Sequence, residues 1–139
     1  MKKLLFLCFT VSTFYVSAQK INESKVPASV KTTFSKSYPS TEGKWVKEDG
    51  NYEVTFDKDA KKMTLVIAPS GTLVQSEYAI KFAELPKAAT DYLTSNYKGV
   101  KIVEMAHITK PNGDIQFEAE VKGKDILFDS NGKFLSKEK

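Results

Sequence analysis

Residues 26–39 read VPASVKTTFSKSYP, and residues 85–98 read LPKAATDYLTSNYK. Each stretch opens with an apolar residue and a proline, and proline is favoured in a first helical turn because its missing N–H would have no helical partner there. An offset of 59 residues carries Pro27 to Pro86. Apolar residues then recur four apart, which places them on one helix face. The two stretches predict two short amphipathic helices at equivalent positions of an internal repeat.

After each predicted helix the hydrophobic period changes from about 3.6 to two, which predicts strands with one buried and one solvated face. Such strands are typical of antiparallel sheets. Short turns rich in Gly, Asn and Asp separate them, so consecutive strands are expected to form hairpins. The predicted strands are 42–48, 51–57, 62–68, 72–79, 100–109, 114–121, 124–128 and 133–136.

The predicted fold is therefore of the α+β class. It consists of two tandem units, each with one helix followed by a four-stranded antiparallel β-meander, and the helices pack on one face of the sheet or sheets. The first repeat is expected to span 26–80 and the second 81–139, with 25–137 forming one compact globular domain and 19–25 a flexible lead-in.

The N-terminus has the pattern of a secretory signal peptide. Lys2-Lys3 is followed by the apolar run 4–16 and by the small-residue site Val16-Ser17-Ala18. The run is too short to span a bilayer. We expect cleavage after Ala18, a periplasmic or secreted protein, and no transmembrane segment after cleavage. Because the one cysteine, Cys8, is removed with the signal peptide, the apolar core alone must stabilise the mature chain.

All 21 basic residues are lysines. Arginine is the usual residue for bidentate recognition of phosphates and bases, so its absence argues against a nucleic-acid partner. The seven glycines are spread over turns and form no phosphate-binding motif. We therefore expect no nucleic-acid partner and no cofactor.

Residues suited to catalysis or metal binding are few. His107 is the one histidine of the chain, so a zinc site and a nucleophile with an imidazole base both lack donors, and a packed or half-exposed histidine is expected instead. Glu118 and Glu120 share one face of a predicted strand. They leave a carboxylate-based hydrolase as one hypothesis, although such pairs usually form a solvated face. We expect no metal site, no catalytic residues and no enzymatic activity.

Two aromatic residues are candidates for contact with a partner. Trp45 lies on the first predicted strand and Tyr78 at the end of the fourth. Each can be a core residue or an exposed aromatic of the kind that dominates binding hot spots.

The repeat resembles the exported PepSY-like family, which is described as similar to β-lactamase-inhibitor protein. The resemblance covers residues 25–137 and rests on the Val26-Pro27 and Leu85-Pro86 openings and on the closing run 128–133, Phe-Asp-Ser-Asn-Gly-Lys. It implies tandem units of a helix and an antiparallel sheet in the cell envelope, without catalytic residues. PepSY domains are associated with protease propeptides, and the inhibitor comparison implies a sheet surface that grips an enzyme. The inhibitor itself is longer and disulfide-bonded, so the likeness is one of fold, which does not carry function.

The sequence thus favours an exported, non-enzymatic binding module that binds a protein through the open face of its sheet. The partner is an unknown envelope protein, for which an enzyme or a peptidase is one possibility. The alternative is a periplasmic sensor of a small ligand or metal that uses a groove between the two repeats.

Overall fold

The computed structural model describes residues 19–138, so the predicted signal peptide lies outside the described residues. In this part of the chain, nine strands accompany two α-helices and two 3-10 turns. The strands are β1 (Gln19–Ile21), β2 (Lys44–Glu48), β3 (Asn51–Lys58), β4 (Lys61–Ile67), β5 (Leu73–Ala79), β6 (Ile102–Thr109), β7 (Ile115–Val121), β8 (Asp125–Asp129) and β9 (Phe134–Lys137). The helices are α1 (Ala28–Ser37) and α2 (Lys87–Asn96), and the 3-10 turns are Glu23–Lys25 and Phe82–Glu84.

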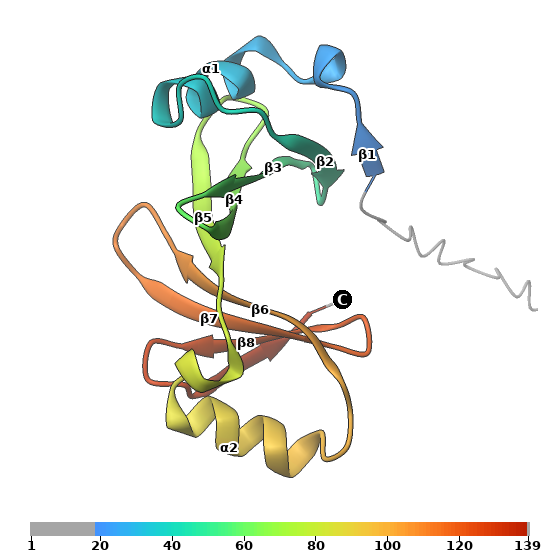
Figure 1. Ribbon diagram of the computed structural model, residues 1–139, viewed down its shortest axis with the longest axis vertical. Coiled ribbons are helices and arrows are strands. Elements are labelled where there is room, and N and C mark those ends of the chain that lie inside the picture. Colours follow the sequence, from blue (N-terminus) through green and yellow to red (C-terminus); the bar gives the residue numbers. More distant parts are fainter. Residues whose placement is uncertain (1–18, 139) are drawn as a thin grey trace, which may run out of the picture.

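All nine strands belong to one antiparallel sheet, in the order β1 to β9 (Figure 1). The prediction of two tandem units, each with one helix followed by a four-stranded meander, is therefore wrong. The two halves are joined by pairing between β5 and β6, which runs from Ser76 opposite Thr109 to Ala79 opposite Ala106. Without this pairing β5 would expose a row of backbone N–H and C=O groups as an edge, and the second half satisfies them.

The segment 19–25, for which the sequence predicts a flexible lead-in, contains β1 and a 3-10 turn instead. β1 pairs with β2, so that Ile21 lies opposite Trp45. Ile21 is partly buried and packs against the core of the first half. The segment is too short to show a periodic pattern and has only one residue that packs on the core. The sequence therefore does not reveal the strand.

The local predictions agree closely with the structure. β2 to β9 begin and end within two residues of the predicted strands, and α1 and α2 lie inside the predicted helical stretches. Each helix buries residues four apart against its own half of the sheet, Val30 and Phe34 in α1 and Ala89 and Leu93 in α2. Their sheet partners in the first half are Trp45, Tyr52, Val54, Phe56, Leu65 and Ile67, and in the second half Ala119, Val121, Ile126 and Phe128.

Two hairpin glycines allow the helices to approach the sheet. Gly71 has φ of +89°, and a Cβ there would lie 2.9 Å from the backbone oxygen of Ser29 in α1. Gly132 has φ of +82°, and a Cβ there would lie 2.7 Å from the backbone nitrogen of Ala89 in α2. Both the left-handed conformation and the close contact require glycine. Gly71 and Gly132 thus occupy equivalent hairpin positions in the two halves of the repeat.

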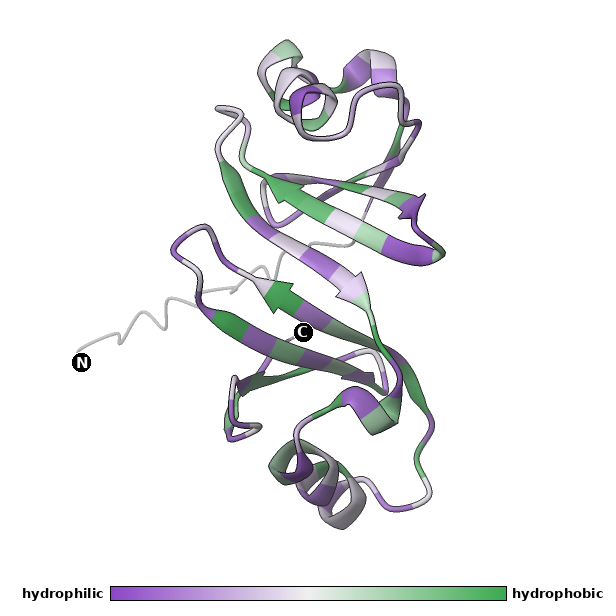
Figure 2. Ribbon diagram, turned by 60° about the vertical axis from the view of Figure 1, so that its left-hand side comes forward, coloured by the Kyte–Doolittle hydropathy of each residue, from purple (hydrophilic) through white to green (hydrophobic). Residues whose placement is uncertain are grey.

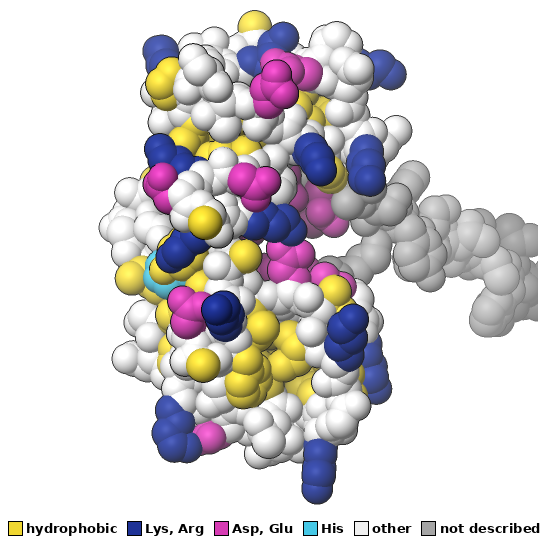
Figure 3. Space-filling model, viewed as in Figure 1, with side chains coloured by type: hydrophobic (Ala, Val, Ile, Leu, Met, Phe, Trp, Pro, Cys, Tyr) yellow, Lys and Arg dark blue, Asp and Glu magenta, His cyan; other side chains and the backbone are white. Residues whose placement is uncertain are grey.

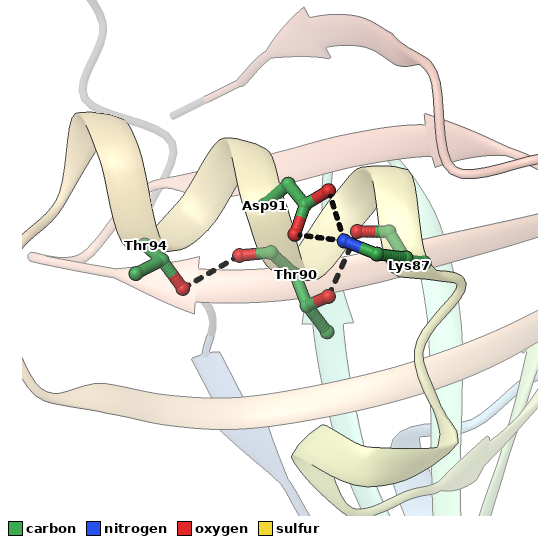
Figure 4. A network of polar contacts seen from close by, with 4 residues as sticks. All are labelled: Lys87, Thr90, Asp91 and Thr94. Atoms are coloured by element: carbon green, nitrogen blue, oxygen red, sulfur yellow. Dashed lines mark hydrogen bonds and ion pairs between the residues drawn. The ribbon is translucent and has the colours of Figure 1, made fainter.

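The outer face of α2 carries polar side chains (Figure 4), and those of Lys87 and Asp91 are 86% and 62% exposed. The Lys87 ammonium lies 2.9 and 2.7 Å from the two carboxylate oxygens of Asp91, one turn along the helix. The Thr90 hydroxyl donates to the Lys87 carbonyl and the Thr94 hydroxyl to the Thr90 carbonyl, at 2.8 and 2.7 Å. Exposed pairs of this kind contribute only a few tenths of a kcal/mol, which makes this face a suitable place for control substitutions.

Both helices cover the same face of the sheet. A continuous line of paired residues runs from the first core to the second on that face, through Phe56, Met63, Tyr78, His107, Phe117 and Phe128. The helices nevertheless lie at opposite ends of the molecule, with both halves of the sheet between them (Figure 1). The sheet must therefore coil strongly, and its uncovered face becomes the inside of the bend (Figure 2).

Candidate functional site: an acidic groove on the uncovered face of the sheet

The uncovered face of the sheet forms a groove of about 660 Å³ between the two halves. We call it the acidic groove because its lining contains nine carboxylates and, from the described residues, one lysine, Lys62. Acidic side chains are visible in the hollow between the halves in Figure 3. The carboxylates are Glu48, Asp49, Glu53, Glu77, Glu104, Glu118, Glu120, Asp125 and Glu138.

The alternation of each strand directs these carboxylates away from the helices. In β3, Glu53 stands between the core residues Tyr52 and Val54. In β7, Glu118 stands next to Ala119, which is fully buried beneath α2. Since successive side chains of a strand point to opposite faces, burial of the apolar neighbours places Glu53 and Glu118 on the uncovered face.

Where the two halves meet, the base of the groove is apolar. Val66 and Ala106 line the groove and are each only 6% exposed. Ile108, which lies opposite Glu77 in the β5–β6 pairing, is 1% exposed. These apolar side chains displace water from the base of the groove, and the carboxylates beside them are half-buried as a result.

Half-burial changes the protonation of Glu118 and Glu53. Burial first, and then the negative charges of Asp125, Glu77 and other groove carboxylates, raise the pKa of Glu118 to about 8. Burial, and to a smaller extent the negative charge of Glu77, raises the pKa of Glu53 to about 7. Both effects disfavour the charged carboxylate.

Asp125 and Glu77 are affected in the same direction. Burial, followed by the charge of Glu120, raises the pKa of Asp125 to about 6. Burial also raises the pKa of Glu77, against the opposing effects of a hydrogen bond from the Gln75 amide at 2.6 Å and of the Lys110 charge. A group of carboxyls that is uncharged or partly charged near neutral pH can bind a cation and release protons as it does so.

Two lysines contact polar side chains beside the groove. The Lys62 ammonium lies 2.7 Å from a Glu104 carboxylate oxygen, and both side chains are about half exposed. The Lys110 ammonium donates to the side-chain oxygen of Gln75. These contacts show that an ammonium group fits against the polar atoms of this face. In the part of the chain that the structure describes, no group of three or more His, Cys, Asp or Glu residues is arranged to hold a metal ion.

The two predicted partner-binding residues lie outside the groove. Trp45 is 4% exposed and packs edge-on against Phe34 beneath α1, with ring centres 5.6 Å apart. Tyr78 lies on the helix-covered face, where it stacks on His107 at 4.6 Å and lies beneath the Lys61 ammonium. Contact of either residue with a partner stays a prediction.

His107 is packed, as its place in the strand pattern predicts. Its ring stacks on Tyr78 and meets Phe117 edge-on, and its Nδ1 is buried without a hydrogen-bond partner. Because the register places it on the helix side, it lies across the sheet from the acidic groove.

The sequence does not identify the groove carboxylates as a site. The sequence pattern places Glu118 and Glu120 on the same strand face and predicts that this face is solvated. In the structure Glu118 is half-buried, and both residues line the groove. The alternation of apolar and polar residues along each strand is enough to place Glu53, Glu77 and Glu118 on polar faces. It does not show that the sheet bends toward those faces and so brings the three carboxyl groups together.

None of the helices within residues 19–138 is long and apolar enough to cross a membrane.

A family model described as "Putative beta-lactamase-inhibitor-like, PepSY-like" matches the chain twice, at residues 14–75 and 71–136. No curated protein sequence matches it.

Solved structures from Bacteroides species share the fold. A "putative periplasmic" protein from Bacteroides eggerthii is 18% identical, with a TM-score of 0.66, over 81% of this chain and 88% of that one. A DUF2874 family protein from Bacteroides uniformis is 18% identical, with a TM-score of 0.65, over 80% and 87%. A BLIP-like protein from Bacteroides fragilis is 19% identical, with a TM-score of 0.58, over 81% and 85%. At these identities the likeness concerns the fold alone.

Proposed function

Since this chain belongs to the PepSY-like, β-lactamase-inhibitor-like family, we propose that it is a non-enzymatic binding module of the cell envelope. Its ligand is a protein, and its binding surface is the acidic groove. The observation that carries this proposal is the concave, uncovered sheet face lined by nine carboxylates. The two helices leave this face free, and an uncovered concave surface is a common place for a ligand.

The charge of the groove defines the chemistry of the partner. An extended segment rich in lysine or arginine complements a surface with nine carboxylates and one lysine. The partner of this proposal is an envelope protein with an accessible basic segment, which can belong to an enzyme or a peptidase.

The proposal includes export. The likeness to proteins described as "putative periplasmic" and the N-terminal pattern of residues 1–18 support a periplasmic or secreted location, with cleavage after Ala18. A small domain outside the cytosol without cysteine must depend on its two cores for stability.

The proposal is tested by fluorescence anisotropy with a dye-labelled oligolysine peptide and the mature chain. The groove variant replaces Glu53 and Glu118 with glutamine. The control replaces the exposed Asp59 and Asp91 with asparagine, which removes the same number of carboxyl groups outside the groove. We expect saturable binding to the wild type, at least tenfold weaker binding to the groove variant, and a change of less than twofold in the control.

Absence of binding, or equal losses in the two variants, would contradict a specific groove. Thermal shifts with metal ions and small ligands distinguish the sensor alternative. A ligand that raises the unfolding midpoint of the wild type but not of the groove variant, in a chain that does not bind oligolysine, would favour a sensor.

A further inference from the structure

A second pocket lies within the first half of the molecule, at the end where α1 lies (Figure 1). It has a volume of about 370 Å³ and shares no lining residue with the acidic groove. Its walls are α1, the 3-10 turn Glu23–Lys25 and the segment 41–43 that leads into β2. The volume is within the range of pockets that hold small molecules.

The base of this pocket is aromatic. Phe34 and Trp45 line it, and both belong to the first core, where they are 6% and 4% exposed. The indole N–H of Trp45 donates to no acceptor among residues 19–138, yet it is not one of the polar atoms that are buried there without a partner. This donor is therefore accessible to a ligand.

Three hydroxyl groups line the pocket around the aromatic base. The Thr32 hydroxyl donates to the Ala28 carbonyl at 2.8 Å, and the Ser35 hydroxyl donates to the Thr32 carbonyl at 3.2 Å. The Thr41 hydroxyl donates to the Pro39 carbonyl at 3.4 Å. Because each hydroxyl hydrogen is already used, the hydroxyl oxygens are available to a ligand as acceptors.

Charged side chains complete the lining. They are the carboxylates of Glu23 and Glu42 and the ammonium group of Lys31, and none of the three forms an ion pair within residues 19–138. Acceptors thus come from the 3-10 turn, from α1 and from the segment before β2, on different walls of one pocket. A ligand that satisfies them must carry several hydrogen-bond donors around an apolar body.

The internal repeat shows that the core does not require this arrangement. The offset of 59 residues that relates the two helices carries Thr41 to Val100 and Gly43 to Ile102. Val100 and Ile102 pack against the second core. The first half instead has a hydroxyl group and no side chain at these positions, and both residues line the pocket.

We propose that this pocket is a binding site for a neutral sugar ring. Such a ring has hydroxyl donors around its edge and an apolar face of C–H groups, which match the acceptors and the aromatic base of the pocket. An organic cation offers its donors at one point, and the Lys31 ammonium opposes its charge, while Glu23 and Glu42 oppose an anionic sugar. The site goes beyond the proposed function and is independent of what the acidic groove binds.

The test is a titration of the ¹⁵N-labelled mature chain with glucose, galactose, mannose and N-acetylglucosamine, followed by amide and indole chemical shifts. Because Trp45 is the one tryptophan, its indole N–H gives a single resonance. We expect at least one of these sugars to shift this resonance and the amides of 41–43 saturably, with half-saturation on the order of 1 mM. The amides of Glu53 and Glu118 in the acidic groove should not change.

The pocket variant combines Thr32→Val and Thr41→Val, which removes two acceptor oxygens and keeps the shape of the side chains. The control combines Thr90→Val and Thr94→Val, whose hydroxyls donate to carbonyls of α2 in the same way. We expect binding at least about fivefold weaker in the pocket variant and a change of less than about twofold in the control.

Absence of shifts with all four sugars, or equal losses in the two variants, would overturn the proposal. Choline is the cationic probe, and shifts of the same resonances at lower concentrations of choline than of any sugar would also overturn it. Oligolysine binding is measured separately, so its failure would concern the acidic groove alone.

Discussion

Replacement of Glu118 by glutamine should stabilise the folded chain at alkaline pH. Between about pH 4.5 and 8 the folded state retains a proton on Glu118 that the unfolded state has lost, because the pKa is raised from 4.5 to about 8 in the folded chain. The folded state thus binds more protons than the unfolded state, and stability falls as pH rises through this window. Glutamine has nearly the same shape and cannot ionise, so the variant avoids this loss.

The magnitude follows from the two pKa values of Glu118. A tenfold change in an acid dissociation constant corresponds to about 1.4 kcal/mol, so the rise of this pKa from 4.5 to about 8 costs the folded state about 4 kcal/mol at pH 8. Water reaches the groove and the other carboxyls respond to the lost charge, which reduces the expected gain to about 2 kcal/mol. For a domain of this size, that gain raises the unfolding midpoint by about 6 °C.

The assay is thermal and urea unfolding, followed by circular dichroism, at pH 4.5 and pH 8. We expect E118Q to match the wild type at pH 4.5 and to exceed it at pH 8. The control D91N alters an exposed carboxylate of α2 and should change stability by less than about 0.5 kcal/mol at either pH. The reasoning is refuted if E118Q is no more stable than the wild type at pH 8, or if its gain is equal at both pH values.

Three further predictions concern the cores and the charge of the groove. Gly132→Ala should lower the free energy of unfolding, measured with urea, by about 3 kcal/mol, because it combines left-handed backbone strain with a 2.7 Å clash beneath α2. The control Gly113→Ala, where a Cβ would have nothing within 4 Å, should lower it by only about 1 kcal/mol. Equal losses in the two variants would argue against the close contact between Gly132 and the helix. Trp45→Ala should cost about 3 to 5 kcal/mol, and a loss below about 1 kcal/mol would show that this ring is not a core anchor. Raising salt from about 0.05 M to about 0.5 M at pH 8 should stabilise the wild type more than E118Q, because ions screen repulsion among the carboxylates; an equal response of the two proteins would count against that repulsion.

The elements of the fold could be predicted because they depend on local patterns. The four-residue spacing of Val30 and Phe34 and the alternation around Val54 each determine which face of an element is apolar, and the structure buries those faces. The predicted gaps between strands 62–68 and 72–79 and between strands 124–128 and 133–136 likewise contain the hairpin glycines Gly71 and Gly132.

The joining of the two halves could not be predicted in this way. The pairing of Tyr78 with His107 is a contact between residues far apart in the chain, and no local period encodes it. β1 could not be predicted either, because its only core contact is Ile21.

The acidic groove depends on the same long-range feature. Glu53 and Glu118 read as ordinary polar positions of two separate strands. The charge of Glu53 helps to raise the pKa of Glu118 only because β5 and β6 join the halves and the sheet then coils toward its uncovered face. Sequence patterns assign a residue to a face, whereas the curvature of the sheet decides whether that face is flat and wet or concave and half-buried.

The most direct test of the proposed binding surface is a titration of the ¹⁵N-labelled mature chain with unlabelled oligolysine, followed by amide chemical shifts at about pH 7. We predict that the largest shifts lie on the groove strands, at and beside Glu53, Glu77 and Glu118, and that the amides of α1 and α2 change little. Shifts centred on the helices or on the edge strands β1 and β9, or no shifts at all, would contradict the assignment of the binding surface to the acidic groove.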